Sequence, residues 1–373
     1  MKRQFYDVTP DLAGGAMLHR NRAVVSSFLF WFSFGLAWIC VAFPPFRYLS
    51  YGVPFFVLLA VIIDGGGVIK DELWPFMIVL GIGLMFGPVT KTEGWKDMLF
   101  MVAGISVAFM KQLPKVRMWL IFWAWTVAFV FLYGVLAGRF SQGFHFSLSS
   151  SDSSFEGNFG FMFPMLVPFA LWHRKYLLAF LSAVLAVLTL KRIALLAMLA
   201  SAFFVLLGER RGRWLLNIPV MLALNVVVLV LDFMYVLGQF DTLIFKYTGQ
   251  SANQLGMGRK VLHQFVVEDL MNQPWQSLIG RGLGSVYLLA EQGFGMFTRM
   301  NLHSDLLKLC YEIGYIGTIA VLCSMYSSKH YMTRVGFLFL NVLFFTDNTL
   351  IYYFFLFFFM LLMRLERENR LEA

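Results

Sequence analysis

The sequence is poor in charge, because only 14% of its residues are Asp, Glu, Lys or Arg, whereas soluble domains carry about 25%. Cysteine is also scarce: three residues lie in apolar stretches without paired spacing, which excludes a disulfide framework and a cysteine zinc site. The sequence has no Asp-x-Asp and no His-Glu-x-x-His pattern, so the usual devices for divalent metals are missing. We therefore expect no metal ion and no other cofactor.

The sequence is instead rich in hydrophobic residues. Hydrophobic residues make up 59% of the chain, aromatic residues 18%, and the mean hydropathy is +0.71. These values predict an integral membrane protein, in which each span takes about 20 residues. The first apolar run, 23–43, is too long for a signal-peptide core and lacks a small-residue cleavage site, so we expect it to remain as a span.

The hydropathy pattern predicts an all-α, polytopic bundle with about twelve transmembrane helices. The expected spans are 23–43, 49–63, 74–89, 98–110, 116–136, 159–172, 176–190, 193–207, 214–238, 306–325, 335–346 and 348–363. Several are shorter than about 17 residues, so they would need local thinning of the bilayer or extension beyond these boundaries.

The basic residues orient this bundle. The net charge is +9, and short loops such as 173–175 (HRK), 208–213 (GERRGR) and 327–334 (SSKHYMTR) carry an excess of Lys and Arg. The positive-inside rule then puts these loops and both termini in the cytoplasm. Orientation accounts for the charge, so nucleic acid is excluded as a partner.

This orientation divides the chain into five segments. They are a cytoplasmic N-terminal segment 1–22, helices one to nine at 23–238 with a periplasmic loop at 137–158, a large periplasmic loop 239–305, helices ten to twelve at 306–363, and a cytoplasmic tail 364–373. The cytoplasmic loops are too short for a nucleotide-binding domain. Any chemistry is expected on the periplasmic side.

The large loop shows internal order. Apolar residues recur at helical spacing over 258–272, which predicts an amphipathic helix lying on the membrane surface. Gly280, Gly282 and Gly284 follow, with Arg281 among them, and predict a turn whose backbone approaches a ligand closely. The alternative is a surface helix with a flexible connector.

The stretch NLHSDLLKLCYEIGYIGT, 301–318, keeps charged residues at the start of a predicted span. His303 would lie in the first helical turn, where the helix dipole disfavours imidazolium and leaves a neutral base next to an anion site. Lys308 and Glu312, four residues apart, would pair inside the membrane boundary as functional candidates. The alternative is a helix-capping histidine beside a structural Lys–Glu pair.

Lys191 and Arg192 interrupt the apolar stretch 176–207. As one helix this stretch would measure about 48 Å, too long for a bilayer, so we expect a hairpin with both cations at its outer turn. They would either snorkel to lipid headgroups or form an inward-facing anion site.

Arginine suits phosphate because its planar fork binds oxygen atoms in pairs and keeps its charge. Arg192, Arg259 and Arg281 are therefore expected to converge on one anion outside the membrane. With His303 as the base, this set suits transfer of a sugar from a lipid diphosphate: the histidine takes the acceptor proton and the arginines stabilise the departing diphosphate.

The His303 stretch resembles the signature of the bacterial O-antigen ligase and O-antigen polymerase superfamily. That signature is His followed by Asn, Ser or Gln, then nine residues and Gly-x-x-Gly-Thr, matched here by His303, Ser304, Gly314, Gly317 and Thr318. Ile319 stands where some members have glycine. Three further regions are similar to the family in the same order: Arg192 with Leu196 in an Arg-x-x-x-Leu pattern, the loop helix led by Arg259, and Asn158 before a mid-chain span.

The resemblance implies a metal-independent, GT-C-like membrane glycosyltransferase that uses an undecaprenyl-diphosphate-linked glycan in the periplasm. His303 would activate the acceptor, and Arg192 and Arg259 would hold the diphosphate. Further substrate contacts are expected from Lys191, Arg281, Asn158, Lys308 and Glu312.

Two family activities differ in the acceptor, which is another lipid-linked repeat for a polymerase and the lipid A core for a ligase. The aromatic C-terminal segment and the compact length favour the polymerase. A flippase for the same lipid-linked oligosaccharide is the alternative from another class, although we find no repeated halves of the kind common in transporters. The expected partners are the glycan donor and acceptor, membrane lipids, and possible chain-length regulator and flippase proteins of the inner membrane.

Overall fold

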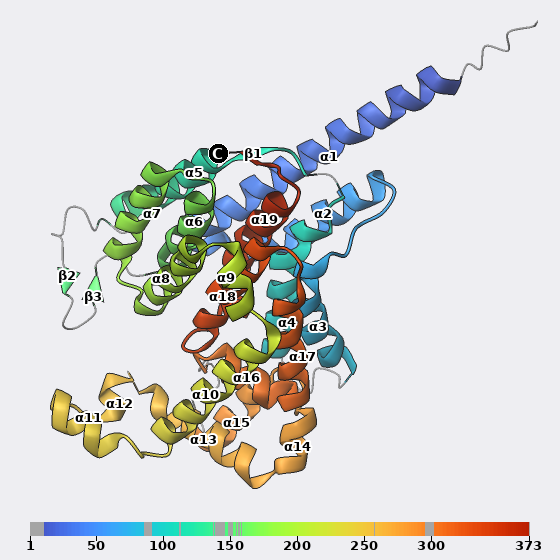
Figure 1. Cartoon of the computed structure of the whole chain (residues 1–373). Coiled ribbons are helices and arrows are strands. Elements are labelled where there is room, and N and C mark those ends of the chain that lie inside the picture. Colours follow the sequence, from blue (N-terminus) through green and yellow to red (C-terminus); the bar gives the residue numbers. More distant parts are fainter. Residues whose placement is uncertain are drawn as a thin grey trace, which may run out of the picture.

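A computed structural model describes residues 11–85, 92–111, 113–136, 146–147, 152–153, 159–256, 258–294 and 302–372, with the single positions 138, 155 and 157. Within these residues the chain is predominantly helical and forms no barrel, which confirms the all-α class (Figure 1).

The α-helices follow one another along the chain with few other elements. The first ten are α1 Asp11–Ala42, α2 Gly52–Ile63, α3 Trp74–Met85, α4 Thr92–Ile105, α5 Met118–Val130, α6 Phe159–Trp172, α7 Tyr176–Thr189, α8 Arg192–Leu207, α9 Glu209–Leu215 and α10 Ile218–Val236. The next five are α11 Asp241–Thr248, α12 Ala252–Leu255, α13 Arg259–Asn272, α14 Pro274–Ile279 and α15 Ser285–Phe294. The last four are α16 Asp305–Glu312, α17 Gly314–Ser327, α18 Tyr331–Phe344 and α19 Tyr353–Arg367.

Shorter elements connect these helices. The 3₁₀ helices are η1 Pro44–Tyr51, η2 Asp71–Leu73, η3 Ser106–Phe109 and η5 Thr349–Ile351, and η4 Phe131–Leu136 is a π-helix. Strand β1 Val116–Arg117 pairs in parallel with β4 Leu371–Glu372, and β2 Phe146–Ser147 pairs antiparallel with β3 Asp152–Ser153.

Four helices in the described part of the chain are long and apolar enough to cross a membrane. They are Arg22–Ala42, Pro45–Ile63, Met118–Leu136 and Ile218–Val236. Shorter apolar helices are Phe159–Trp172, Tyr176–Thr189, Arg192–Leu207, Gly314–Ser327 and Tyr331–Phe344. The expected count of twelve spans is not confirmed, because several predicted spans correspond to shorter helices and the span 306–325 is divided between α16 and α17.

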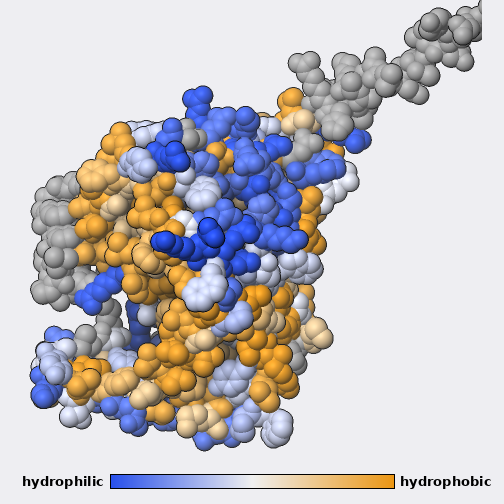
Figure 2. Space-filling view, in the orientation of Figure 1, coloured by the Kyte–Doolittle hydropathy of each residue, from blue (hydrophilic) through white to orange (hydrophobic). Residues whose placement is uncertain are grey.

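The centre of the bundle is formed by α6, α18 and α19, whose side chains are buried over most of their lengths. Helices that are apolar on every side are expected in such a position. The surrounding helices, among them α1, α7, α8 and α10, expose many large apolar side chains. Figure 2 shows these side chains as a hydrophobic belt across the middle of the molecule, which suits contact with lipid.

Polar structure lies at both ends of this belt. At one end, seen as the hydrophilic upper face in Figure 2, the buried Arg364 lies 3.6 Å from Glu72, and Arg367 donates to the same carboxylate at 2.5 Å. At the other end lie α11–α15, the lower group of helices in Figure 1. We call this group, residues 239–294, the loop subdomain.

The loop subdomain meets the bundle at the break between α16 and α17. Gly314 starts α17 with φ 74°, and Gly280 follows α14 with φ 92°. A Cβ atom on Gly280 would lie 2.5 Å from the Glu312 carbonyl oxygen, and one on Gly314 would lie 2.5 Å from the Gly280 nitrogen. Gly282 N–H donates to the Glu312 carbonyl at 2.8 Å. The glycine-rich turn therefore lets the backbones of α14 and α17 meet closely.

Candidate active site

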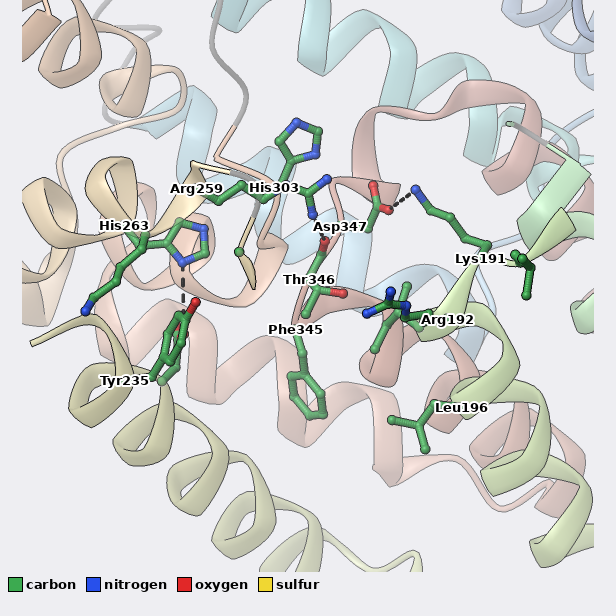
Figure 3. Close-up of a pocket in the computed structure, with 15 residues that line it drawn as sticks. Lys191, Arg192, Leu196, Tyr235, Arg259, His263, His303, Phe345, Thr346 and Asp347 are labelled. Carbon is green, nitrogen blue, oxygen red and sulfur yellow. Dashed lines mark hydrogen bonds and ion pairs between the residues drawn. The ribbon is translucent and has the colours of Figure 1, made fainter. Parts of the chain in front are cut away.

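A cavity of about 480 Å³ lies where the loop subdomain faces the α7–α8 turn. Its polar lining comes from five parts of the chain: Lys191 and Arg192 at the α7–α8 turn, Asp232 and Tyr235 on α10, Arg259, Lys260 and His263 on α13, His303 before α16, and Thr346 and Asp347 after α18. Figure 3 shows Lys191 and Arg192 on one side and Arg259, His263 and His303 on the other. Predicted site residues far apart in sequence thus share one cavity.

The expected hairpin at Lys191 and Arg192 is present. Leu190 ends α7 in the left-handed region with φ 49°, and Arg192 begins α8. The Lys191 ammonium lies 2.9 Å from the Asp347 carboxylate and 5.0 Å from the centre of the Phe161 ring. These contacts hold Lys191 inside the protein, which argues against the snorkelling alternative for this residue.

Arg259 is the first residue of α13, directly after Gly258 with φ 79°. Its guanidinium Nη1 donates to the Thr346 carbonyl at 3.4 Å and points toward His303 in Figure 3. The predicted helix is confirmed, but its expected orientation is wrong. Its apolar side buries residues such as Val266 and Leu270 against α10, α15 and α16, so this side faces protein and not lipid.

His303 lies just outside the helix in which it was expected. Ser304 is the N-cap of α16 and accepts a hydrogen bond from Leu307 N at 3.2 Å, and the helix begins at Asp305. His303 itself has φ 55°, a left-handed conformation that is uncommon for residues other than glycine. The αL turn directs the ring away from the helix axis and into the cavity.

The charge around His303 favours the neutral imidazole. Burial lowers the pKa of His303 below its usual value, and the Arg259 guanidinium lowers this pKa further. Asp347 opposes these effects, while Lys191 adds to them. The neutral ring is thus the expected form at neutral pH, but burial and neighbouring cations are the cause instead of the helix dipole.

Six polar residues of the cavity lining were not among the predicted site residues, and His263 and Asp347 are two of them. His263 Nε2 lies 2.6 Å from the Leu302 carbonyl oxygen, so Nε2 carries the proton and fixes the peptide that precedes His303. Its Nδ1 lies 3.9 Å from Asp232. The buried Asp347 accepts from Asn348 N and Tyr352 OH, both at 2.9 Å. The only sequence signal for His263 is its spacing of one helical turn from Arg259.

Three predicted residues lie away from the cavity. Arg281 binds Asp269 at 2.9 Å and stacks 4.4 Å from the Tyr311 ring centre, so the expected convergence with Arg192 and Arg259 does not occur. The expected pairing of Lys308 with Glu312 is replaced by two other contacts. Lys308 Nζ donates to Asp97 at 2.5 Å, and the Glu312 carboxylate accepts from Gly284 N at 2.9 Å. Asn158 lies outside the described residues.

The cavity carries an excess of positive charge. Its lining has four Lys and Arg side chains against two carboxylates, and Lys260 is already paired with Asp241 outside the lining. Such a surplus suits an anionic group with several oxygen atoms. Among the residues that the structure describes, no group of three or more His, Cys, Asp and Glu side chains is placed to hold a metal ion.

Comparison with known proteins gives one match. Residues 177–322 match a family model described as O-antigen ligase, a region that contains Arg192, Arg259 and His303. The match covers less than half of the chain and confirms the resemblance found in the sequence. No curated protein and no solved structure gives a significant match. The apolar belt and the four long apolar helices indicate a membrane protein, and residues 177–322 are similar to the matched family.

Proposed function

We propose, from the similarity of residues 177–322 to the O-antigen ligase family, that this chain is an inner-membrane polymerase of undecaprenyl-diphosphate-linked oligosaccharide repeats. The observation that carries the proposal is the shared cavity of Arg192, Arg259 and His303, contributed by three separate segments. Two guanidinium groups and one neutral imidazole lining the same cavity suit a reaction that creates negative charge on a leaving group while a hydroxyl group loses its proton.

In the proposed reaction, the neutral His303 ring takes the proton of an acceptor sugar hydroxyl. The acceptor oxygen then bonds to the anomeric carbon of the donor, and the bond from that carbon to the diphosphate oxygen breaks. The electron pair leaves with the polyprenyl diphosphate, where Arg192 and Arg259 stabilise the added charge through forked hydrogen bonds. Asp347 holds Lys191 at the cavity wall, so this cation adds to the field at the diphosphate.

A lipid-linked donor is supported by the surface of α8 that leads away from Arg192. Leu196, Leu199 and Phe203 follow Arg192 at helical spacing, and all three are exposed. Leu196 also lines the cavity. A polyprenyl chain lying along this face would leave its diphosphate next to Arg192. We therefore propose that the cavity binds the diphosphate headgroup and that the α8 face binds the polyprenyl tail.

The proposed orientation puts the cavity on the periplasmic side and both termini in the cytoplasm. The basic stretches 173–175, 208–213 and 327–334 support it. His173 lies 2.5 Å from Glu366 in the last turn of α19, and Arg213 on α9 donates to the Lys329 carbonyl at 2.7 Å. A periplasmic polymerase needs its donor delivered across the membrane and its product length limited, so a flippase and a chain-length regulator are the proposed partners.

A purified-protein assay tests the polymerase proposal. Protein in detergent is given lipid-linked single repeats together with lipid A core, and products are separated by size. We expect longer lipid-linked chains, because the cavity would hold a donor while a second repeat supplies the hydroxyl. Transfer to lipid A core without chain growth would replace the polymerase by a ligase, the activity for which the matched family model is named. Unchanged substrate in both forms would favour a flippase.

Chelation is expected to leave this reaction unchanged. Stabilisation of the diphosphate by guanidinium and ammonium groups requires no divalent ion. The rate of chain growth should therefore be the same before and after dialysis against EDTA, measured on the same lipid-linked repeats. A large loss of rate that added magnesium or manganese restores would overturn the proposed division of roles.

A further inference from the structure

Two short helices of the loop subdomain, α11 and α14, expose most of their apolar side chains. In α11, Leu243, Phe245 and Tyr247 are 54%, 63% and 76% exposed, and none of the helix's residues is buried within the described chain. In α14, Trp275 is 81% exposed, and the single buried residue is Ser277.

Helices this short are not expected to persist in water on their own. An isolated helix below about 12 residues is marginal even with favourable residues, and helices in proteins take most of their stability from a packed apolar face. Helix α11 has eight residues and α14 has six. Their protein contacts supply little apolar burial, so another apolar phase must cover them.

The position of α11 identifies that phase. Helix α11 begins at Asp241, with only four residues between it and the end of α10 at Val236. The 19 residues of α10 measure about 28 Å, close to the thickness of the hydrocarbon core, and most of their surface is exposed and apolar. The chain thus leaves the bilayer at Val236, and α11 must lie near headgroup depth.

The position of α14 gives the same depth independently. Gly280, directly after α14, packs against Gly314, the first residue of α17. In the first turns of α17, Ile316 and Ile319 are 60% and 49% exposed on the outside of the bundle. The exposed side chains of α14 therefore continue a surface that already faces lipid. Figure 1 shows α11 and α14 at opposite ends of the loop subdomain.

We propose that α11 and α14 are two membrane anchors that lie in the lipid interface and hold the loop subdomain at headgroup depth. Their composition fits this location, because Phe245, Tyr247 and Trp275 are aromatic residues of the kind enriched at membrane interfaces, and the exposed Lys246 suits anionic lipid headgroups. The anchors replace the role expected for α13, whose apolar face is occupied by protein.

The anchors would also fix the depth of the cavity. Asp241, the first residue of α11, forms an ion pair with Lys260 on α13, directly next to Arg259. Tyr235 OH, at the end of α10, donates to the Ala252 carbonyl of α12 at 2.8 Å. These contacts connect α11, at the membrane interface, to the residues that form the cavity wall.

Spin labelling in vesicles tests the anchors without any activity measurement. Single cysteines are introduced as Phe245→Cys and Trp275→Cys in a Cys323→Ser background, since the two remaining cysteines are buried. Leu199→Cys on α8 serves as the lipid-exposed control, and Gln264→Cys serves as the polar control, because the half-buried Gln264 side chain of α13 donates to the exposed Glu268. The labelled proteins are placed in vesicles of phosphatidylethanolamine and phosphatidylglycerol.

We expect labels at 245 and 275 to collide more often with oxygen than with a water-soluble nickel complex, with depths between those of the two controls. When the labelled proteins are transferred from detergent to the vesicles, the mobility of the labels at 245 and 275 should fall more than the mobility of the label at 264. Collision ratios equal to that at position 264 would overturn the proposal for whichever helix shows them. Because no substrate is involved, these outcomes are separate from the fate of the proposed polymerase activity.

Discussion

Replacing His303 with alanine is expected to lower the rate of glycosyl transfer about 10²- to 10⁴-fold, the usual contribution of a positioned general base. The reason is geometric: His303 lines the cavity beside Arg259, and burial keeps its ring neutral and able to accept a proton. The measurement is chain growth on lipid-linked repeats by purified variants at equal protein concentration. Protein level in the membrane should not change.

Alanine alone does not separate loss of the base from backbone strain, because the residue has φ 55°. Asparagine is the matched control, since it tolerates this left-handed conformation and cannot act as a base at neutral pH. His303→Asn should therefore be as inactive as His303→Ala while keeping the stability of the parent. The parent's rate should rise with pH through a pKa below the ordinary histidine value and then level off. An active asparagine variant would remove His303 from the reaction.

Substitution of Arg192 by lysine should reduce kcat/KM about 10- to 100-fold. A lysine keeps the charge but loses the second, parallel hydrogen bond to the diphosphate, and one charge-assisted hydrogen bond contributes about 1.5–3 kcal/mol. The assay is the same chain-growth reaction, measured over a range of donor concentrations. Since the diphosphate gains charge as the bond breaks, the loss should appear in kcat as well as in KM.

The matched control is Arg211→Lys, on the exposed α9 away from the cavity, which should behave as the parent. If Arg192 served only to reach lipid headgroups, lysine would replace it fully. Near-normal turnover by Arg192→Lys would therefore exclude a forked contact with the leaving group.

Features that depend on local sequence were predictable. The Lys191–Arg192 hairpin followed from a stretch too long for a bilayer, and α13 followed from its apolar spacing. Four of the predicted site residues, Lys191, Arg192, Arg259 and His303, line the same cavity.

Features that depend on distant partners were not predictable. Lys308 binds Asp97, which lies 211 positions away, so the nearby Glu312 was the only partner that helical spacing suggested. The break between α16 and α17 depends on Gly280, which follows α14 and packs against Gly314. A hydropathy average over the sequence does not detect such a break, so it predicted one continuous span. Asp347 gave no signal, because its ion-pair partner Lys191 and the neighbouring His303 both lie far from it in the sequence.

Helix α13 carries both Arg259 and, one turn later, His263, whose ring grips the Leu302 carbonyl. Helix α13 thus connects Arg259, the proposed donor-binding residue, to the peptide that orients the His303 imidazole. In the proposed reaction, a diphosphate bound by Arg259 would therefore also act, through α13 and His263, on the peptide in front of His303. Selectivity for the correct lipid carrier would then affect the rate of the reaction as well as the binding affinity.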